Sequence, residues 1–425
     1  MKNNFIKINM LLLCVICIST ISYAQVVGDV SFLKGKWLEV AISDCGTYTS
    51  GANGVITTPP APYHENNFDG SLGFTNDWSQ DGWDLGVPDQ CGDYVMPGSP
   101  EEGFALQYGD GPVYGNIGPY CYSYGLFTPD LPHFSGSNIY NLNAGAIRKS
   151  IWQGTNGVLG VVISQTTYYS TKKQSFVTIV DICNGGDDIT DLYYARNVDP
   201  DNDQVTNGIF NTQNNVVKQY LTGGYSHVEA SSTIASPCYA SYVTADPRAK
   251  VSHGNFSMGE PYDMWNGLNG YIQTTGANNE DASIQVSYKI ESLAHNDCEC
   301  VAYSTVLLPA TVPENVALSS TACATLGTLA RYGEDLVAEY LENPIAFLQN
   351  EFFTYPNPSN GNFTLNMFDI ENANIRIVNA LGEVVYTANG VSNVSGIYLD
   401  NALPGLYFIT VEHDGKTNTK SIVIE

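Results

Sequence analysis

The stretch Tyr355-Pro356-Asn357-Pro358, with the residues that follow it to Glu425, determines how this chain of 425 residues is organised. Proline fixes φ and disfavours helix in the residue before it, so this stretch is expected to be extended and cannot continue a helix. Short alternating apolar runs separated by turn residues follow, which predicts a small immunoglobulin-like β-sandwich. The predicted strands are residues 362–368, 374–378, 383–386, 396–399, 406–412 and 421–424.

The motifs of this segment occur in a specific order. Tyr-Pro-Asn-Pro is followed by Ile375-Arg376-Ile377-Val378-Asn379 with Gly382-Glu383-Val384-Val385, then by Leu403-Pro404-Gly405-Leu406-Tyr407-Phe408-Ile409 and a final strand that contains lysine. In this order the motifs of residues 354–425 resemble the type A sorting domain of the type IX secretion system. The resemblance implies the type IX machinery as a partner and export across the outer membrane of a Gram-negative bacterium, followed by secretion or attachment at the outer cell surface.

The N-terminus is consistent with export. Lys2 and Lys7 precede an apolar run over residues 10–21, and Ser22-Tyr23-Ala24 supplies the small residues of a signal peptidase site. We therefore predict a signal peptide over residues 1–24. A membrane anchor needs about 20 apolar residues, which this run lacks, so we expect no transmembrane segment in the mature chain.

The composition narrows the class of protein. The chain has 17 Lys+Arg against 43 Asp+Glu, a net charge of −26. Loss of Lys2 and Lys7 would make it −28, so nucleic acid is not an expected partner, because binding it depends on basic side chains. Solubility outside the cell and cation binding both explain such acidity. The abundance of Tyr, Gly and Pro favours strands and turns.

Eight cysteines lie beyond the predicted signal peptide. An even number in an exported chain predicts disulfides, and the sequence leaves their pairing open. Cys298-Glu299-Cys300 is the only closely spaced pair, and no second pair with zinc-ligand spacing accompanies it.

The predicted fold class is all-β: a large β-sandwich body over residues 25–318, a helical connector over 319–353 and the sorting domain over 354–425. Residues 174–183 and 188–197 are predicted to form a hairpin around Asn184-Gly185-Gly186-Asp187. Ser319 or Ser320 is expected to cap the connector helix. The run Arg196-Asn197-Val198-Asp199-Pro200-Asp201 after the predicted hairpin faintly resembles the extended sandwich of galactose-mutarotase-like proteins, and this resemblance assigns no catalytic residue.

Aromatic and acidic residues occur together at several places in the body. Trp78 and Trp83 beside Asp81 would suit a sugar, because a flat ring stacks on a pyranose and a carboxylate holds its hydroxyls. Tryptophans also fill cores, and that alternative stays open.

Asp199, Asp201 and Asp203 alternate along the chain, which favours a calcium ion because calcium takes several oxygen ligands in irregular geometry. The spacing does not fit an EF-hand, since Gln204 and Phe210 replace its glycine and glutamate. An ordinary acidic turn is the alternative.

A further candidate stretch spans residues 253–266. If the body is an enzyme, His253 could act as base, Glu260 or Asp263 as acid and Trp265 as a sugar platform. The sequence contains no established spacing of a zinc protease, a nucleophile elbow or a phosphate-binding loop.

Two classes of function follow from these patterns. The first is a secreted or surface protein that binds glycan or matrix in the manner of an adhesin, with calcium as a stabilising ion. The second is a carbohydrate-active enzyme, either a lyase, a hydrolase or an epimerase.

Overall fold

The structure, a computed structural model, describes most of the chain beyond the predicted signal peptide. The described residues are 24–52, 55–64, 70–79, 82–83, 91–95, 102–118, 133–201, 208, 211–233, 238–255, 259–332, 334–345, 352–367, 370–392, 394–400 and 402–425. The predicted signal peptide, apart from Ala24, lies outside them, as do Asp81 and Asp203. Among the described residues, no helix has the length and apolar character needed to cross a bilayer.

The body is built on a sheet of nine strands whose neighbours run antiparallel. Their long alternating runs of β-branched and aromatic residues favour the pleated conformation. In spatial order they are β18 (Gly276–Glu280), β14 (Thr212–Lys218), β15 (Ser226–Ser232), β16 (Tyr239–Thr244), β20 (Cys298–Val306), β12 (Ser175–Asn184), β11 (Val161–Ser170), β10 (Ile147–Asn156) and β9 (Ser135–Ala144).

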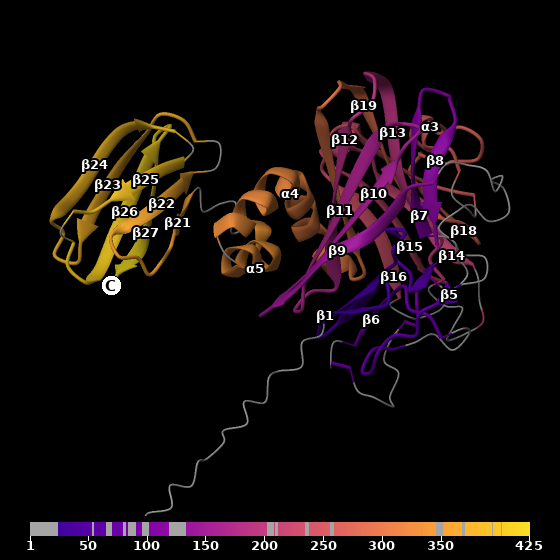
Figure 1. Ribbon diagram of the computed structural model, residues 1–425, viewed down its shortest axis with the longest axis horizontal. Helices are drawn as coiled ribbons and strands as arrows, with labels where there is room; N and C mark the ends of the chain where they lie inside the picture. The colour runs from indigo at the N-terminus through magenta and orange to yellow at the C-terminus, as the bar shows by residue number, and fades with distance from the viewer. Residues whose placement is uncertain are drawn as a thin grey trace, which may run out of the picture.

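A five-stranded antiparallel sheet lies against one face of the nine-stranded sheet (Figure 1). Its order is β17 (Ala249–His253), β19 (Ile284–Leu293), β13 (Ile189–Val198), β7 (Glu102–Tyr108) and β8 (Val113–Ile117). Buried residues of both sheets, among them Val180, Tyr303, Tyr194 and Val286, form one hydrophobic core. The predicted large β-sandwich is therefore confirmed.

The first strands form a smaller sheet beside this core. Its order is β1 (Ala24–Val27), β2 (Val30–Lys34), β3 (Leu38–Ile42) and β6 (Phe74–Asn76), and the short pair β4 (Gly51–Ala52) and β5 (Val55–Ile56) lies nearby in sequence. Both faces of β3 are buried, because Leu38 and Val40 join the main core while Ala41 packs with Phe32 and Tyr63.

The predicted hairpin around residues 184–187 is wrong. β12 pairs with β11 and β20, whereas β13 pairs with β7 and β19 in the opposite sheet. Asn184 donates from its side-chain amide to the carbonyls of Asp187 (2.7 Å) and Leu293 (3.0 Å). These bonds hold the tight turn against the end of β19, so the chain crosses from one sheet to the other instead of returning alongside β12.

Helices cover the outer faces of both sheets. α4 (Val312–Tyr332) and α5 (Glu334–Glu342) pack on the nine-stranded sheet, where Leu326 and Leu329 of α4 share an apolar cluster with Val177 of β12. α3 (Pro261–Asn266) packs on the five-stranded sheet through Met264. A short helix, α2 (Tyr220–Gly223), lies between β14 and β15.

The predicted cap of the connector helix at Ser319 or Ser320 is also wrong, because α4 begins at Val312. It follows directly on a 3-10 turn, Pro309–Thr311, whose first residue is proline. Proline suits a helix start, since its φ is already helical and the first turn needs no N–H from it. Inside α4, Ser319 instead accepts a hydrogen bond from the backbone N–H of Ala245 at 3.2 Å.

The C-terminal region forms a second, smaller sandwich with a core of its own (Figure 1). One sheet contains β21 (Phe352–Tyr355), β22 (Asn362–Met367) and β25 (Val394–Tyr398). The other contains β24 (Val384–Val391), β23 (Ala373–Asn379), β26 (Gly405–His413) and β27 (Lys416–Ile424). Phe353 of β21 packs in the cluster formed by α4 and α5, which connects this sandwich to the helices.

Three disulfides join described residues of the body. Cys183–Cys298 links neighbouring strands β12 and β20, Cys300–Cys323 links β20 to α4, and Cys91–Cys238 joins residues 147 positions apart in sequence. Cys298 and Cys300 thus take part in different disulfides, in agreement with the predicted oxidised state.

An ion pair lies in the middle of the main core. The Arg196 guanidinium donates from Nε to Glu102, and both side chains are fully buried. Arg196 also donates to Gln165 Oε1 (2.8 Å) and to the carbonyl of Gly46 (3.2 Å), and it lies 4.4 Å from the centre of the Tyr48 ring. Burial disfavours its charge, but Glu102 and the surrounding tyrosines outweigh burial and raise the pKa of Arg196.

We predict that Glu102→Gln lowers the free energy of unfolding by about 3–5 kcal/mol, because it leaves a buried cation without its partner. Urea unfolding followed by tryptophan fluorescence measures the change. Lys172→Met is the control, since it removes an exposed ion pair with Glu342 that is worth about 0–1 kcal/mol. Equal effects of the two substitutions would contradict the prediction.

Candidate functional site

A pocket of about 460 Å³ opens where the N-terminal sheet meets β10 and β11. This volume lies in the range of small-molecule sites, about 300–1,000 Å³. We call it the Trp83 pocket; its lining residues are Lys34, Gly35, Lys36, Pro62, Trp83, Arg148 and Thr171. Three of these seven residues are basic, in a chain that has only 17 Lys+Arg.

The turn between β2 and β3 shapes one wall of this pocket. Lys36 donates its backbone N–H to the carbonyl of Thr171 at 3.0 Å, which fastens the turn to the end of β11. A Cβ on Gly35 would lie 1.9 Å from the Tyr169 hydroxyl and 2.7 Å from the Cα of Thr171. Only glycine therefore fits at position 35. Lys34 and Lys36 flank this glycine, one on each side of the turn.

Lys34 lies deep in the pocket, with 6% of its surface exposed. Its ammonium donates to Glu39, its cross-strand partner, and to the carbonyl of Pro62 at 3.2 Å, and it lies 4.7 Å from the centre of the Trp83 ring. An ammonium has three N–H donors, and the bonds of Lys34 to described residues use two of them. Burial lowers the pKa of Lys34.

Glu39 and His64 support Lys34 from behind. The fully buried carboxylate of Glu39 accepts bonds from the His64 ring (3.0 Å) and the His64 backbone N–H (2.8 Å). Burial and the neighbouring Lys34 lower the pKa of His64 to about 4, so the ring is neutral at physiological pH. The His64 ring centre lies 4.5 Å from that of Trp83, and this contact holds the indole in place.

Arg148 and Trp83 complete the pocket. Arg148, 6% exposed, donates to the carbonyls of Lys34 (2.9 Å), Gly145 (3.1 Å) and Ile147 (2.9 Å). The Trp83 indole donates to the carbonyl of Gly35 at 3.1 Å. The pocket therefore combines a fixed, half-buried aromatic ring with buried and exposed cations. Such a site can bind an apolar ring face and polar or anionic groups together.

The two predicted tryptophans of this region have different surroundings. Trp83 lines the pocket, whereas Trp78, with 39% of its surface exposed, is absent from the described lining. Asp81, predicted to accompany them, lies outside the described residues. The ligand-binding roles of Trp78 and Asp81 stay predictions.

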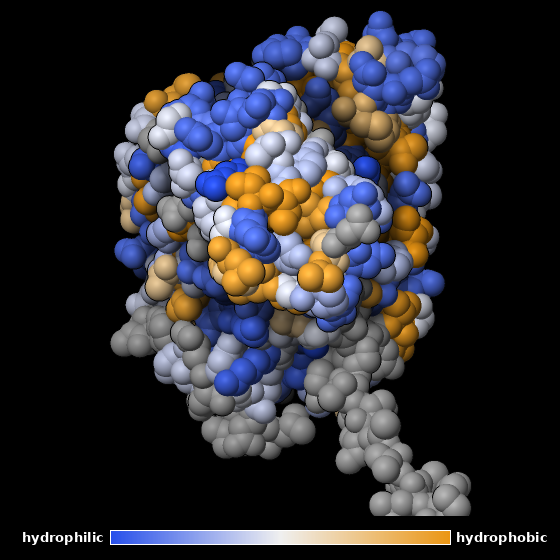
Figure 2. All heavy atoms as spheres, turned by 90° about the vertical axis from the view of Figure 1, so that its left-hand side faces the viewer, coloured by the Kyte–Doolittle hydropathy of each residue, from blue (hydrophilic) through white to orange (hydrophobic). Residues whose placement is uncertain are grey.

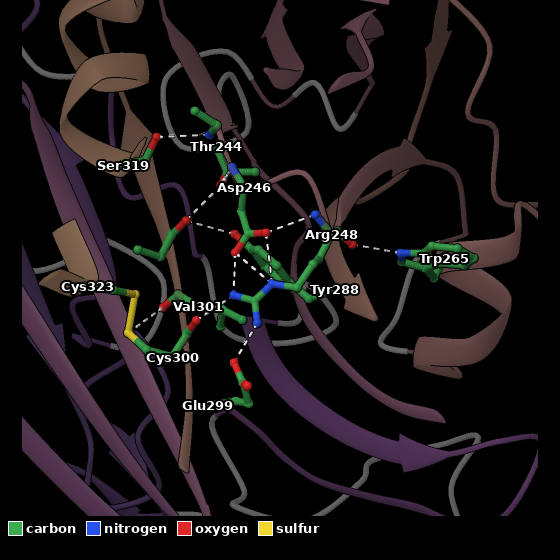
Figure 3. A network of polar contacts seen from close by, with 12 residues as sticks. Thr244, Asp246, Arg248, Trp265, Tyr288, Glu299, Cys300, Val301, Ser319 and Cys323 are labelled. Carbon is green, nitrogen blue, oxygen red and sulfur yellow. Dashed lines mark hydrogen bonds and ion pairs between the residues drawn. A yellow bond between two sulfur atoms is a disulfide. The ribbon is translucent and has the colours of Figure 1, made fainter. Parts of the chain in front are cut away.

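Trp265, the third tryptophan predicted to stack on a sugar, belongs to a polar network that contains none of the described lining residues of the Trp83 pocket (Figure 3). Its indole donates to the carbonyl of Arg248 at 3.0 Å, and the Lys250 ammonium lies 3.6 Å from its ring centre. Arg248 in turn bonds Asp246 (2.7 Å) and Glu299 (2.8 Å), as Figure 3 shows. A ring held by these contacts has less free face for a sugar.

The candidate catalytic residues lie on two elements. His253 ends β17, and Glu260 and Asp263 lie at the start of α3. Glu260 accepts a bond from Gln107 (3.3 Å) and Asp263 accepts one from Asn269 (2.6 Å). His253 is 1% exposed, and its Nδ1 has no hydrogen-bond partner among the described residues. Burial lowers the pKa of His253, and the carboxylate of Glu280 offsets only part of this shift. The catalytic roles of all three stay predictions.

The predicted calcium ligands follow β13. Asp199 and Asp201 are both buried, and Asp203 lies outside the described residues. Burial and the nearby carboxylates of Asp281 and Asp93 raise the pKa of Asp201 to about 8. In the part of the chain that the structure describes, no group of three acidic, histidine or cysteine side chains is arranged to hold a metal. Calcium therefore stays a prediction.

Comparison with known proteins identifies the C-terminal sandwich. Residues 354–425 match the family model of a secretion system C-terminal sorting domain. The C-terminal sandwich is a type IX sorting domain. The chain is accordingly exported to the cell surface or secreted, and its sorting domain interacts with the secretion machinery.

Several solved structures have a distant likeness to the chain. A bacterial glucoamylase complexed with acarbose is 9% identical with a TM-score of 0.34; the match covers 59% of this chain and 32% of that one. The BSP domain of a biofilm-associated protein is 9% identical with a TM-score of 0.15, covering 66% and 61%. PorZ, a surface component of the type IX secretion system of Porphyromonas gingivalis, is 9% identical with a TM-score of 0.17, covering 95% and 86%.

These values are too low to relate the body to any of the three proteins. No curated protein matches the sequence. The chain spans about a third of the glucoamylase chain and less than two thirds of the biofilm-associated chain. These comparisons therefore assign no ligand and no reaction to the body.

The sorting domain exposes apolar side chains on one side. Leu381 and Leu403 are 84% and 76% exposed. Tyr407, which pairs with Asn379 just before Leu381, donates its hydroxyl to the carbonyl of Leu403 at 2.8 Å, so both leucines lie at the same end of the sheet. Figure 2 shows hydrophobic residues gathered on the side of the molecule that the sorting domain occupies.

The sequence indicated Trp83 as a candidate binding residue, and its binding role stays a prediction; the basic residues that line the pocket with it were not predicted. Lys34 and Glu39 are cross-strand partners, and Arg148 comes from a strand more than a hundred residues away. Lys34 and Lys36 on either side of a glycine, in a chain poor in cations, were the available signal.

We expect calcium to raise the melting temperature of the exported chain if Asp199, Asp201 and Asp203 bind it, since a ligand bound only to the folded state stabilises that state. Differential scanning calorimetry with calcium, with magnesium and with a chelator measures this. Asp201→Asn should abolish the calcium effect. Identical melting temperatures in all three conditions would contradict the predicted calcium site.

Proposed function

We propose that this exported protein binds a glycan through the Trp83 pocket, as an adhesin-like module at the cell surface or in the medium. The observation that carries the proposal is the pocket itself, where a half-buried indole stands beside polar and cationic groups. Sugars present a C–H face that stacks on aromatic rings and hydroxyls that bond polar groups.

The arrangement behind the pocket supports binding more than turnover. Glu39 is occupied by Lys34 and by two donors of His64, so its carboxylate is not placed as a general acid. The lining that the structure describes contains no carboxyl group. Glycoside hydrolysis commonly needs a pair of carboxyl groups beside the scissile bond. The enzyme alternative therefore rests on His253, Glu260 and Asp263, outside this pocket.

We further propose that the exposed apolar end of the sorting domain is the face that the secretion machinery contacts. Leu381 and Leu403 are supported by two further exposed side chains, Leu406 and Val423, which are cross-strand partners. Exposed apolar groups of this kind are typical of protein-binding surfaces.

The glycan proposal predicts that Trp83→Ala weakens binding about tenfold or more, because the stacking surface is lost. A glycan array with the exported chain, residues 25–425, finds the ligand, and calorimetry with that glycan measures the affinity. Trp78→Ala is the matched control, since it removes an exposed tryptophan outside the described pocket lining. Unchanged affinity in Trp83→Ala, or loss only in Trp78→Ala, would contradict the proposal.

The export proposal predicts that the pair Leu381→Asp and Leu403→Asp reduces the fraction of protein outside the cell severalfold without unfolding the sorting domain, because both side chains are exposed. Quantitative blotting of periplasm, cell surface and medium measures the fraction. Leu221→Asp, an equally exposed position in the body, is the control. Normal export of the double variant would show that the secretion machinery does not depend on this face of the sorting domain.

A further inference from the structure

We infer that the ligand of the Trp83 pocket is an anionic saccharide, with a carboxylate or sulfate group held by the cations and its ring against Trp83. The inference rests on the proposed function and adds the charge of the ligand to it. Three observations carry it: the charge of the lining, the depth of two of the cations and the position of the third.

The lining has positive charge in excess. Lys36 and Arg148 contribute two cations, and Lys34, whose pKa burial lowers to about 7, contributes a partial one. The described lining residues include no carboxylate. Glu39, behind Lys34, offsets one of these charges. Among the described residues at the pocket, the net charge is therefore positive, opposite in sign to the charge of the whole chain, which is −26. Binding of a neutral sugar would not require a positively charged pocket in a negatively charged protein.

Lys34 and Arg148 are buried at the pocket, and their side chains donate hydrogen bonds to Glu39 and to backbone carbonyls. Lys34 and Arg148 are each 6% exposed, and a buried cation is costly unless it is paired. The Arg148 guanidinium is oriented by three backbone carbonyls, including that of Lys34 itself. The two cations thus form one rigid unit, and an anion in the pocket would be attracted by both.

Lys36 supplies a flexible cation at the rim. Its side chain is exposed, and its ammonium lies 3.9 Å from the centre of the Trp37 ring. It can leave this ring to bond a carboxylate or sulfate without uncovering a buried group. Because Lys36 takes no part in the Lys34–Glu39–His64 cluster, substitution at this position changes the pocket's charge and leaves its architecture in place.

Calorimetry with three oligosaccharide probes tests the inference: a galacturonic acid oligomer, a sulfated galactan oligomer and an uncharged glucan oligomer. We expect the exported chain to bind one or both acidic probes at least tenfold more tightly than the uncharged one, since a charge-assisted hydrogen bond changes affinity by about ten- to a hundredfold. The two acidic probes distinguish carboxylate from sulfate as the group that is held.

Lys36→Glu should lower the affinity for the acidic probe about tenfold or more and lower the affinity for the uncharged probe by a much smaller factor. Lys36→Arg should retain acidic binding. Lys218→Glu is the matched control, because Lys218 also lies over an aromatic ring, that of Tyr225 at 4.5 Å, but away from the described pocket lining. Circular dichroism melting verifies that each variant is folded.

The outcomes separate the two proposals. If all three probes bind equally and Trp83→Ala weakens all of them, the glycan pocket stands and the inference about charge is overturned. If Lys36→Glu and Lys218→Glu have the same effect, the inference is overturned as well. If none of the probes and no glycan on the array binds, both proposals fall.

Discussion

The buried ion pair of Arg196 and Glu102 is the constraint on which the sandwich depends. A guanidinium in a closed apolar core must have its donors satisfied, and the acceptors come from different parts of the chain. Glu102 lies on β7, Gln165 on the opposite sheet, and Gly46 in the loop after β3. The pair therefore fixes the relative position of the two sheets, and the bond from Arg196 to Gly46 holds the loop after β3 between them.

That loop is shaped for this position. Gly46 has a φ of 75°, and a Cβ there would lie 2.7 Å from the Trp152 ring, so only glycine leaves room for the indole. The next residues bring the Tyr48 N–H to Glu102 at 2.6 Å. β3, which leads into the loop, is held in the core by Leu38 and Val40. The β2–β3 turn at the other end of β3 then lies against β11, and the Trp83 pocket forms there.

Local patterns predicted the strands well but not their partners. Alternation located β12 and β13 to within a residue, and the ordered motifs located the sorting domain. The turn at residues 184–187 has a hairpin composition, yet its Asn184 side chain bonds across to β19, and no short-range signal encodes that contact. The Trp83 pocket could not be predicted from the sequence for the same reason, because no short-range signal encodes the contacts between its residues. Trp83 is conspicuous in the sequence, whereas its neighbours Lys34 and Arg148 come from distant strands, and β2 itself was not predicted.

The acidity of the whole chain and the basic pocket act over different distances. At physiological ionic strength, charges separated by more than about 8 Å are largely screened, so most of the 43 acidic residues do not act directly on a group bound in the pocket. The pocket cations act at contact distance, where screening is weak. In the proposed complex with an anionic saccharide, the net negative charge of the chain would slow the approach of the ligand, whereas Lys34, Lys36 and Arg148 would govern its rate of dissociation. Anions without a ring to stack on Trp83 would meet the same repulsion and make fewer contacts, so the proposed pocket would select against them.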